Sequence, residues 1–133
     1  MVASPPMFNW RRPTNLGVRD GRFAPCKRSP NCVSSQAEPI DQEHYIAPIA
    51  YSGSMETLRK AIAGLELATI IEAKGDYLYA EFRTPVLRFV DDVELFKSGN
   101  SLHVRSASRL GRRDFKANRR RVEQLRALIQ SLR

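Results

Sequence analysis

The chain has 133 residues, of which 42% are hydrophobic and 27% are charged. This length and balance are typical of one globular domain with its own core, and they exclude a disordered chain. No run of about 18 apolar residues occurs, so no transmembrane segment is predicted. The first residues lack the charged start and apolar stretch of a signal peptide, which predicts a cytoplasmic protein.

The net charge of +8 is concentrated near the C-terminus. Residues 1–104 carry 12 basic and 12 acidic side chains, whereas residues 105–133 carry 10 basic and 2 acidic ones. A basic end of this kind favours an anionic partner, such as nucleic acid, anionic lipid, a phosphorylated ligand or an acidic protein. The alternative is a solvated helix face that is rich in arginine.

Residues 1–43 differ from the rest of the chain, because prolines and glycines interrupt them throughout. Turn signals such as Asp20-Gly21 add to these breaks, and no helix or strand is predicted there. We expect residues 1–15 to form a flexible N-terminal tail. Residues 16–43 contain spaced apolar side chains, and we expect an irregular arm that packs against a single domain spanning residues 16–133.

Regular patterning begins at His44 and gives the order β-α-β-β-β-β-α within residues 44–133. Apolar patterning predicts strands over residues 44–51, 67–73, 77–83, 89–97 and 101–108. A short helix follows the N-cap Ser54, and a long one follows the N-cap Asp114. Two-residue hairpin loops at Gly75 and Gly99 make the sheet antiparallel. The predicted fold class is α+β, with both helices packed on one face of the sheet.

The two cysteines, Cys26 and Cys32, lie in one short loop. Five residues separate them, which is not the C-x-x-C spacing of redox or zinc sites, so no metal site is predicted. Reduced thiols and a disulfide both remain open, depending on the compartment. We expect residues 26–35 to pack onto the domain, with Val33 inserting its side chain and Ser34 bonding to backbone groups.

Four stretches, in order along the chain, resemble a family known only as domain of unknown function 1499. They are residues 16–21, 26–35, 89–94 and 104–111, the last leading to Asn118. In the family pattern an aromatic residue follows the last glycine of these stretches, and a glycine lies two residues before the asparagine. Arg112 and Lys116 occupy those positions here, which makes this chain more basic. The resemblance implies no activity, and it leaves the compartment open because relatives occur in bacteria and in plastid-bearing eukaryotes.

The hairpin around Gly99-Asn100 brings charged residues together. Counting outward from the loop, Glu94 faces Arg105 and Leu95 faces Val104 on the neighbouring strand. Alternation turns Leu95 and Val104 toward the core, so the charged pair shares the opposite face.

Asp92 lies on the same face and is expected to pair with Arg109 or Arg83. Three interpretations are open for this charged face. It is a structural ion-pair network, a pair of carboxylates for acid–base work or a hard cation, or a site where arginines hold an anion and carboxylates orient the arginines.

We predict a non-enzymatic binding domain for an anionic small molecule or an acidic protein surface. The ligand-binding candidates are Asp92, Glu94, Arg105, Arg109 and Arg119, and the structural loop residues are Cys26, Cys32 and Ser34. One alternative is a nucleic-acid-binding protein that uses the arginine-rich end. Another is a small hydrolase that uses Ser34 and His44 with an aspartate. No P-loop or G-x-G-x-x-G motif is present, so no cofactor is predicted.

Overall fold

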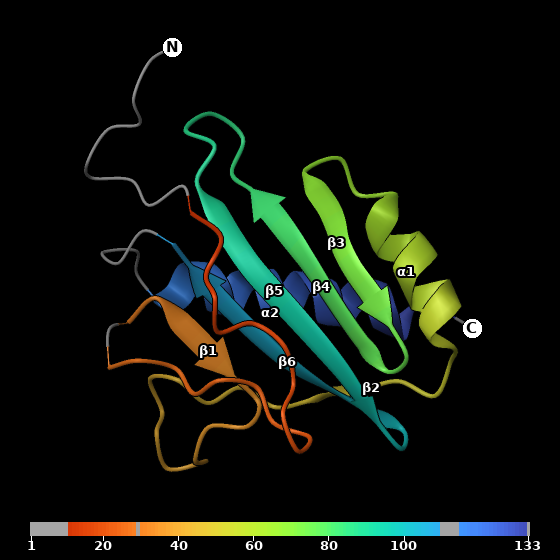
Figure 1. Cartoon of the computed structure of the whole chain (residues 1–133), viewed down its shortest axis with the longest axis horizontal. Helices are drawn as coiled ribbons and strands as arrows, with labels where there is room; N and C mark the ends of the chain where they lie inside the picture. Colours follow the sequence, from red (N-terminus) through yellow and green to blue (C-terminus); the bar gives the residue numbers. More distant parts are fainter. Residues whose placement is uncertain (1–10, 29, 110–114, 133) are drawn as a thin grey trace.

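A computed structural model describes residues 11–28, 30–109 and 115–132. Its strands are β1 (Cys32–Ser34), β2 (Ile49–Ala50), β3 (Ala68–Lys74), β4 (Tyr77–Arg83), β5 (Val90–Ser98) and β6 (Ser101–Ser108), and its helices are α1 (Met55–Ala63) and α2 (Phe115–Gln130). The sheet has the order β1-β6-β5-β4-β3, and β2 also pairs with β6 (Figure 1). The predicted α+β class and order of the main elements are confirmed.

Glycine turns set the register of both hairpins. Gly75 and Gly99 have φ angles of 58° and 60°, in the left-handed region that glycine tolerates best. In the second hairpin Glu94 lies opposite Arg105 and Leu95 lies opposite Val104, so the predicted register is confirmed. Leu95 and Val104 have no exposed surface.

The structure corrects two predictions for the first half of the chain. The strand expected over residues 44–51 is reduced to β2, since Pro48 has no amide hydrogen to donate to a neighbouring strand. The arm, expected to be irregular, contributes β1, which pairs with β6 and places Val33 in the core. Residues 1–10 of the expected tail and the predicted cap Asp114 lie outside the described residues.

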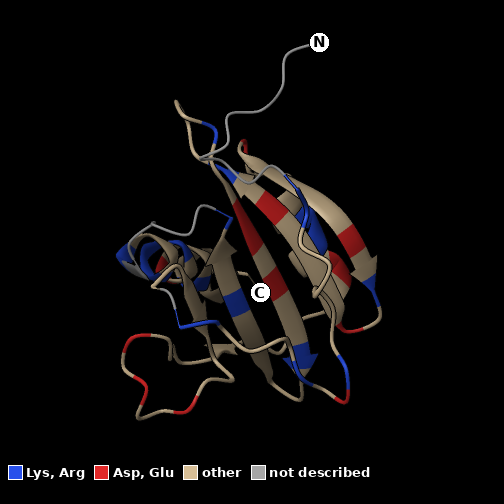
Figure 2. Ribbon diagram, turned by 60° about the vertical axis from the view of Figure 1, so that its left-hand side comes forward, with Lys and Arg blue, Asp and Glu red and all other residues tan. Residues whose placement is uncertain are grey.

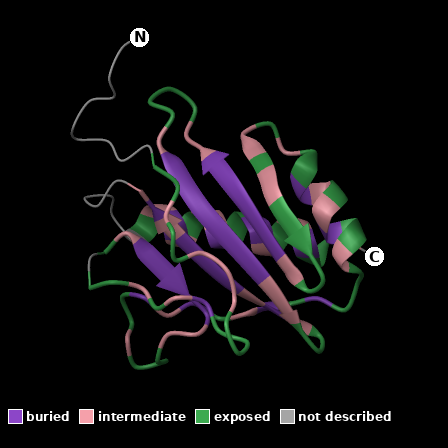
Figure 3. Ribbon diagram, viewed as in Figure 1, coloured by how far each residue is buried: buried purple, intermediate pink, exposed green. Residues whose placement is uncertain are grey.

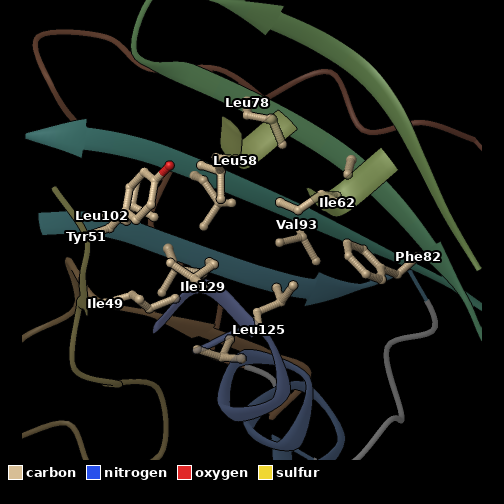
Figure 4. Packing of buried hydrophobic residues seen from close by; sticks show 14 of the residues in the cluster. Ile49, Tyr51, Leu58, Ile62, Leu78, Phe82, Val93, Leu102, Leu125 and Ile129 are labelled. Carbon is tan, nitrogen blue, oxygen red and sulfur yellow. The ribbon is translucent and has the colours of Figure 1, made fainter. Parts of the chain in front are cut away.

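The hydrophobic core lies between one face of the sheet and the two helices (Figure 4). The side-chain hydroxyl of Ser54 caps α1 by accepting a hydrogen bond from the amide of Thr57 at 3.1 Å, as predicted. Both helices place apolar residues at helical spacing toward the sheet. These are Leu58 and Ile62 of α1, and Val122, Leu125 and Ile129 of α2.

The opposite face of the sheet is covered as well. The arm crosses in front of β5 and β6, whereas α2 lies behind them (Figure 1). Residues 90–95 of β5 are therefore buried on both sides, as Figure 3 shows. Within the described part of the chain, no helix is long and apolar enough to cross a membrane.

Arginines of α2 bond to other segments of the chain. Arg126 donates to the carbonyls of Pro48 and Ala47 at 2.7 and 2.8 Å. Arg121 pairs with the buried carboxylate of Asp91 at 3.2 Å. These contacts fasten the helix to the segment before β2 and to the start of β5.

Candidate functional site

The sheet face that lies under the arm is polar and charged. Alternation along the strands turns a set of tyrosines, carboxylates and arginines to this side of the sheet, and the strand register places them next to one another. They are Tyr77, Tyr79 and Glu81 of β4, Asp92 and Glu94 of β5, Arg105 of β6, and Arg109 just beyond β6. Figure 2 shows the acidic and basic bands on adjacent strands. A charged face of this kind is costly to bury unless each group finds a partner.

Arg109 lies at the centre of one half of this network. Its guanidinium contacts Asp92 at 2.8 Å and Glu81 at 2.6 Å. The hydroxyl of Tyr79 lies within hydrogen-bond distance of the same two carboxylates, 2.5 Å from Asp92 and 3.0 Å from Glu81. Arg12, from the arm, donates to Glu81 at 2.7 Å. Arg109 is thus held between two carboxylates, and its side chain is only 6% exposed.

These contacts lower the pKa of Glu81. Burial by itself raises the pKa of this carboxyl, but hydrogen bonds from Arg12, Tyr79 and Arg109 outweigh it and lower the pKa to about 2. Burial also lowers the pKa of Arg109, and its carboxylate partners more than reverse that effect, so the pKa lies above its ordinary value. Both groups are therefore charged near neutral pH.

Glu94 and Arg105 form the second half of the network and are less completely paired. One oxygen of Glu94, Oε2, accepts from the amide of Gly17 at 2.7 Å and from the hydroxyl of Tyr77 at 2.6 Å. The other, Oε1, lies 3.7 Å from Nη1 of Arg105, which is too long for a hydrogen bond. Nη2 of Arg105 reaches the carbonyl of Pro25 at 3.5 Å.

Two buried polar atoms of this pair have no hydrogen-bond partner among the described residues, namely Oε1 of Glu94 and Nε of Arg105. Burial raises the pKa of Glu94, against the hydrogen bonds from Tyr77 and Gly17. Burial lowers the pKa of Arg105, against the charge of Glu94. An arginine nevertheless remains charged near neutral pH. An unsatisfied donor on a buried cation costs free energy unless a bound group accepts from it.

A cavity of about 690 Å³ opens between the arm and the adjoining ends of β6 and β1. Five basic side chains and one carboxylate line it. They are Arg11, Arg12, Lys27, Arg105 and Arg109, with Asp92 as the acid. Because Asp92 already accepts from Arg109 and Tyr79, it orients a cation and adds little net negative charge to the cavity. A cavity lined in this way suits an anion.

The structure brings together four of the five predicted ligand-binding residues, and separates the fifth. Asp92, Glu94, Arg105 and Arg109 lie side by side under the arm. Arg119 lies on α2, on the other side of the sheet, where it donates to the carbonyls of three residues between β1 and β2. These are Gln42, Glu43 and Tyr45, at 3.2, 3.4 and 3.0 Å.

The cysteine loop forms one wall of the cavity. Cys26 and Cys32 are joined by a disulfide bond, which resolves the alternatives left open by their spacing. Cys32 pairs with Ala107 across β1 and β6, and Lys27 of the loop lines the cavity. The hydroxyl of Ser34 accepts from the amide of Gln36 at 3.1 Å, so this side chain stabilises the turn after β1.

Sequence reasoning missed the contribution of the arm and the tyrosines. Arg12 and Gly17 reach carboxylates 69 and 77 residues away, and no local pattern signals such contacts. A signal did exist for Tyr77 and Tyr79, because they alternate with Leu78 on the strand that carries Glu81.

Comparison with known proteins gives one match. No curated protein and no solved structure matches the chain. A family model described as "Protein of unknown function (DUF1499)" matches residues 22–129, which covers most of the domain. The chain belongs to this family, as the resemblance of its sequence motifs implied.

Proposed function

We propose that this protein is a non-enzymatic binding domain that holds a small anion, or an anionic group of a larger partner, in the cavity beneath its arm. The observation that carries the proposal is Arg105. Its side chain is 7% exposed, its Nε has no hydrogen-bond partner among the described residues, and it lines a cavity with four other cations. An anion in the cavity would offset the positive charge of Arg105, which the long contact with Glu94 leaves incompletely paired.

The surrounding network supports the same proposal. The guanidinium of Arg109 donates hydrogen bonds to Asp92 on one side and to Glu81 on the other. It is therefore already oriented before a ligand arrives. Preorganised donors lose little conformational freedom on binding, which raises affinity for a given set of contacts. Phosphate and carboxylate groups match the planar arrangement of arginine donors best.

Two alternatives are less well supported by the contacts. The helix arginines Arg119, Arg121 and Arg126 already bond to carbonyls or to Asp91, which gives them a structural role, so we do not propose nucleic-acid binding through α2. The ring of His44 pairs with the carboxylate of Asp41 at 2.9 Å, beside the turn that Ser34 stabilises. A hydrolase is not proposed.

The compartment is part of the proposal. The sequence predicts a cytoplasmic protein, but a disulfide such as Cys26–Cys32 persists mainly in oxidising compartments. We therefore favour an oxidising compartment. Alkylation of free thiols in intact cells, followed by mass spectrometry, tests this, because modified Cys26 and Cys32 would favour the cytoplasm.

Calorimetric titration with inorganic phosphate and with pyrophosphate, at low salt, tests the binding function. We expect binding by the wild-type protein, loss of binding in Arg105→Gln, and a several-fold weakening in Lys27→Gln, whose exposed side chain lines the cavity. Arg120→Gln removes one charge from an exposed position on α2 and is the matched control. No binding of either anion by the wild type, or equal weakening in Lys27→Gln and Arg120→Gln, would contradict a specific site.

A further inference from the structure

The loop between β4 and β5 exposes two neighbouring apolar side chains. Val86 is 88% exposed and Leu87 is 62% exposed. Among the large hydrophobic side chains that the structure describes, Ile40 is the other one with comparable exposure. One exposed apolar side chain needs no explanation, but two adjacent ones on a projecting loop (Figure 1) point to contact with something apolar.

Hydrogen bonds hold this loop in one shape. The amide of Thr84 donates to the carbonyl of Phe89 at 2.9 Å, and the amide of Arg88 donates to the carbonyl of Thr84 at 3.2 Å. The amide of Phe89 donates to the hydroxyl of Thr84 at 2.9 Å. Arg88 has a φ angle of 59°, in a region that residues other than glycine rarely adopt. The loop is therefore preorganised, and burying its apolar side chains would order little additional backbone.

Charge distinguishes this loop from the one that carries Ile40. Arg83 and Arg88 flank the apolar pair, and at its base Arg12 and Arg83 share the carboxylate of Glu81, at 2.7 and 3.4 Å. The loop of Ile40 contains acidic residues instead, namely Glu38, Asp41 and Glu43. The two loops lie at opposite ends of the molecule (Figures 1 and 2). An anionic surface would attract the first loop and repel the second.

We propose that the β4–β5 loop, residues 84–89, docks this protein on an anionic membrane surface. Val86 and Leu87 insert among the lipid headgroups as far as the acyl-chain boundary, while Arg83 and Arg88 pair with lipid phosphates. Two apolar side chains and a few arginines give a reversible attachment.

The proposed membrane attachment is separate from anion binding in the cavity and does not depend on it. The two features are neighbours, however, because the amide of Arg109 donates to the carbonyl of Val90, directly after the loop, at 3.1 Å. A docked loop would hold the mouth of the cavity close to the headgroup layer.

Co-sedimentation of the full chain with lipid vesicles tests the proposal. The vesicles consist of phosphatidylcholine alone or of equal parts of phosphatidylcholine and phosphatidylglycerol. We expect binding to the anionic vesicles that weakens with added salt, and binding at least about tenfold weaker to the neutral ones. The double variant Val86→Ser, Leu87→Ser should bind anionic vesicles at least about tenfold more weakly, because both side chains lose their apolar burial.

Ile40→Ser is the matched control, because Ile40 and Val86 are equally exposed, and it should bind vesicles as the wild type does. Circular dichroism is used to check that each variant is folded. Lack of binding to anionic vesicles, an equal loss in Ile40→Ser, or normal binding by the double serine variant would overturn the proposal.

Discussion

We expect the charge of Glu81 to stabilise the fold substantially. Its side chain is 4% exposed, and its pKa is lowered from 4.5 to about 2 by contacts with Arg12, Tyr79 and Arg109 that outweigh the effect of burial. Because one pKa unit corresponds to about 1.4 kcal/mol, the ionised carboxylate contributes about 3 kcal/mol to the free energy of unfolding. Glu81→Gln should lose most of this, because Arg109 is left with a weaker acceptor in a buried position.

The direction of the pH dependence follows from the lowered pKa. The folded state binds fewer protons at Glu81 than the unfolded state does, so the stabilisation is complete above pH 4.5 and disappears as the pH falls toward 2. Urea denaturation at a series of pH values measures this. The difference in unfolding free energy between wild type and Glu81→Gln should be largest near neutral pH and should shrink below about pH 4.

Glu56→Gln is the control for this experiment. Glu56 also pairs with an arginine, Arg59, at 2.8 Å, but its side chain is 60% exposed, and solvent screens the pair. We expect little change in stability at any pH. Equal losses in the two variants, or a loss in Glu81→Gln that is the same at acid and neutral pH, would refute the reasoning.

Three further predictions concern stability and are measured by urea denaturation. Asn118→Leu removes one side-chain acceptor and two donors from a fully buried position and should cost about 3 kcal/mol, so unchanged stability would contradict the assigned hydrogen bonds. Reduction with dithiothreitol should cost about 2 kcal/mol through loss of the Cys26–Cys32 loop closure, and the double serine variant at these positions should no longer respond to the reductant. Gly99→Ala should cost about 1 kcal/mol because φ is 60° there, while Gly64→Ala, at a φ of −78°, should cost less.

The parts of the fold that could be predicted are those with local causes. The β5–β6 hairpin follows from one glycine loop and the alternation of apolar residues, and this was enough to place Glu94 beside Arg105. The cap at Ser54 is equally local, because donor and acceptor are three residues apart. Local patterning thus predicted the charged face, although not which residues of the arm bond to its carboxylates.

The parts that could not be predicted depend on contacts between distant segments. β1 has three residues and becomes a strand because β6 offers an edge to pair with, some 70 residues later in the chain. The cavity needs Arg11 and Lys27, whose surroundings in the sequence resemble those of any exposed basic residue. The separation of Arg119 from the other candidates has a similar origin, since the helix that carries it packs behind the sheet.

The boundary of the family match has a practical consequence. The match begins at residue 22, whereas Arg12 and Gly17, which bond to Glu81 and Glu94, come earlier in the chain. A chain shortened to begin at residue 22 would retain its strands and helices, yet two buried carboxylates would face water and one wall of the cavity would be gone. The segment before the match is therefore part of the folded unit.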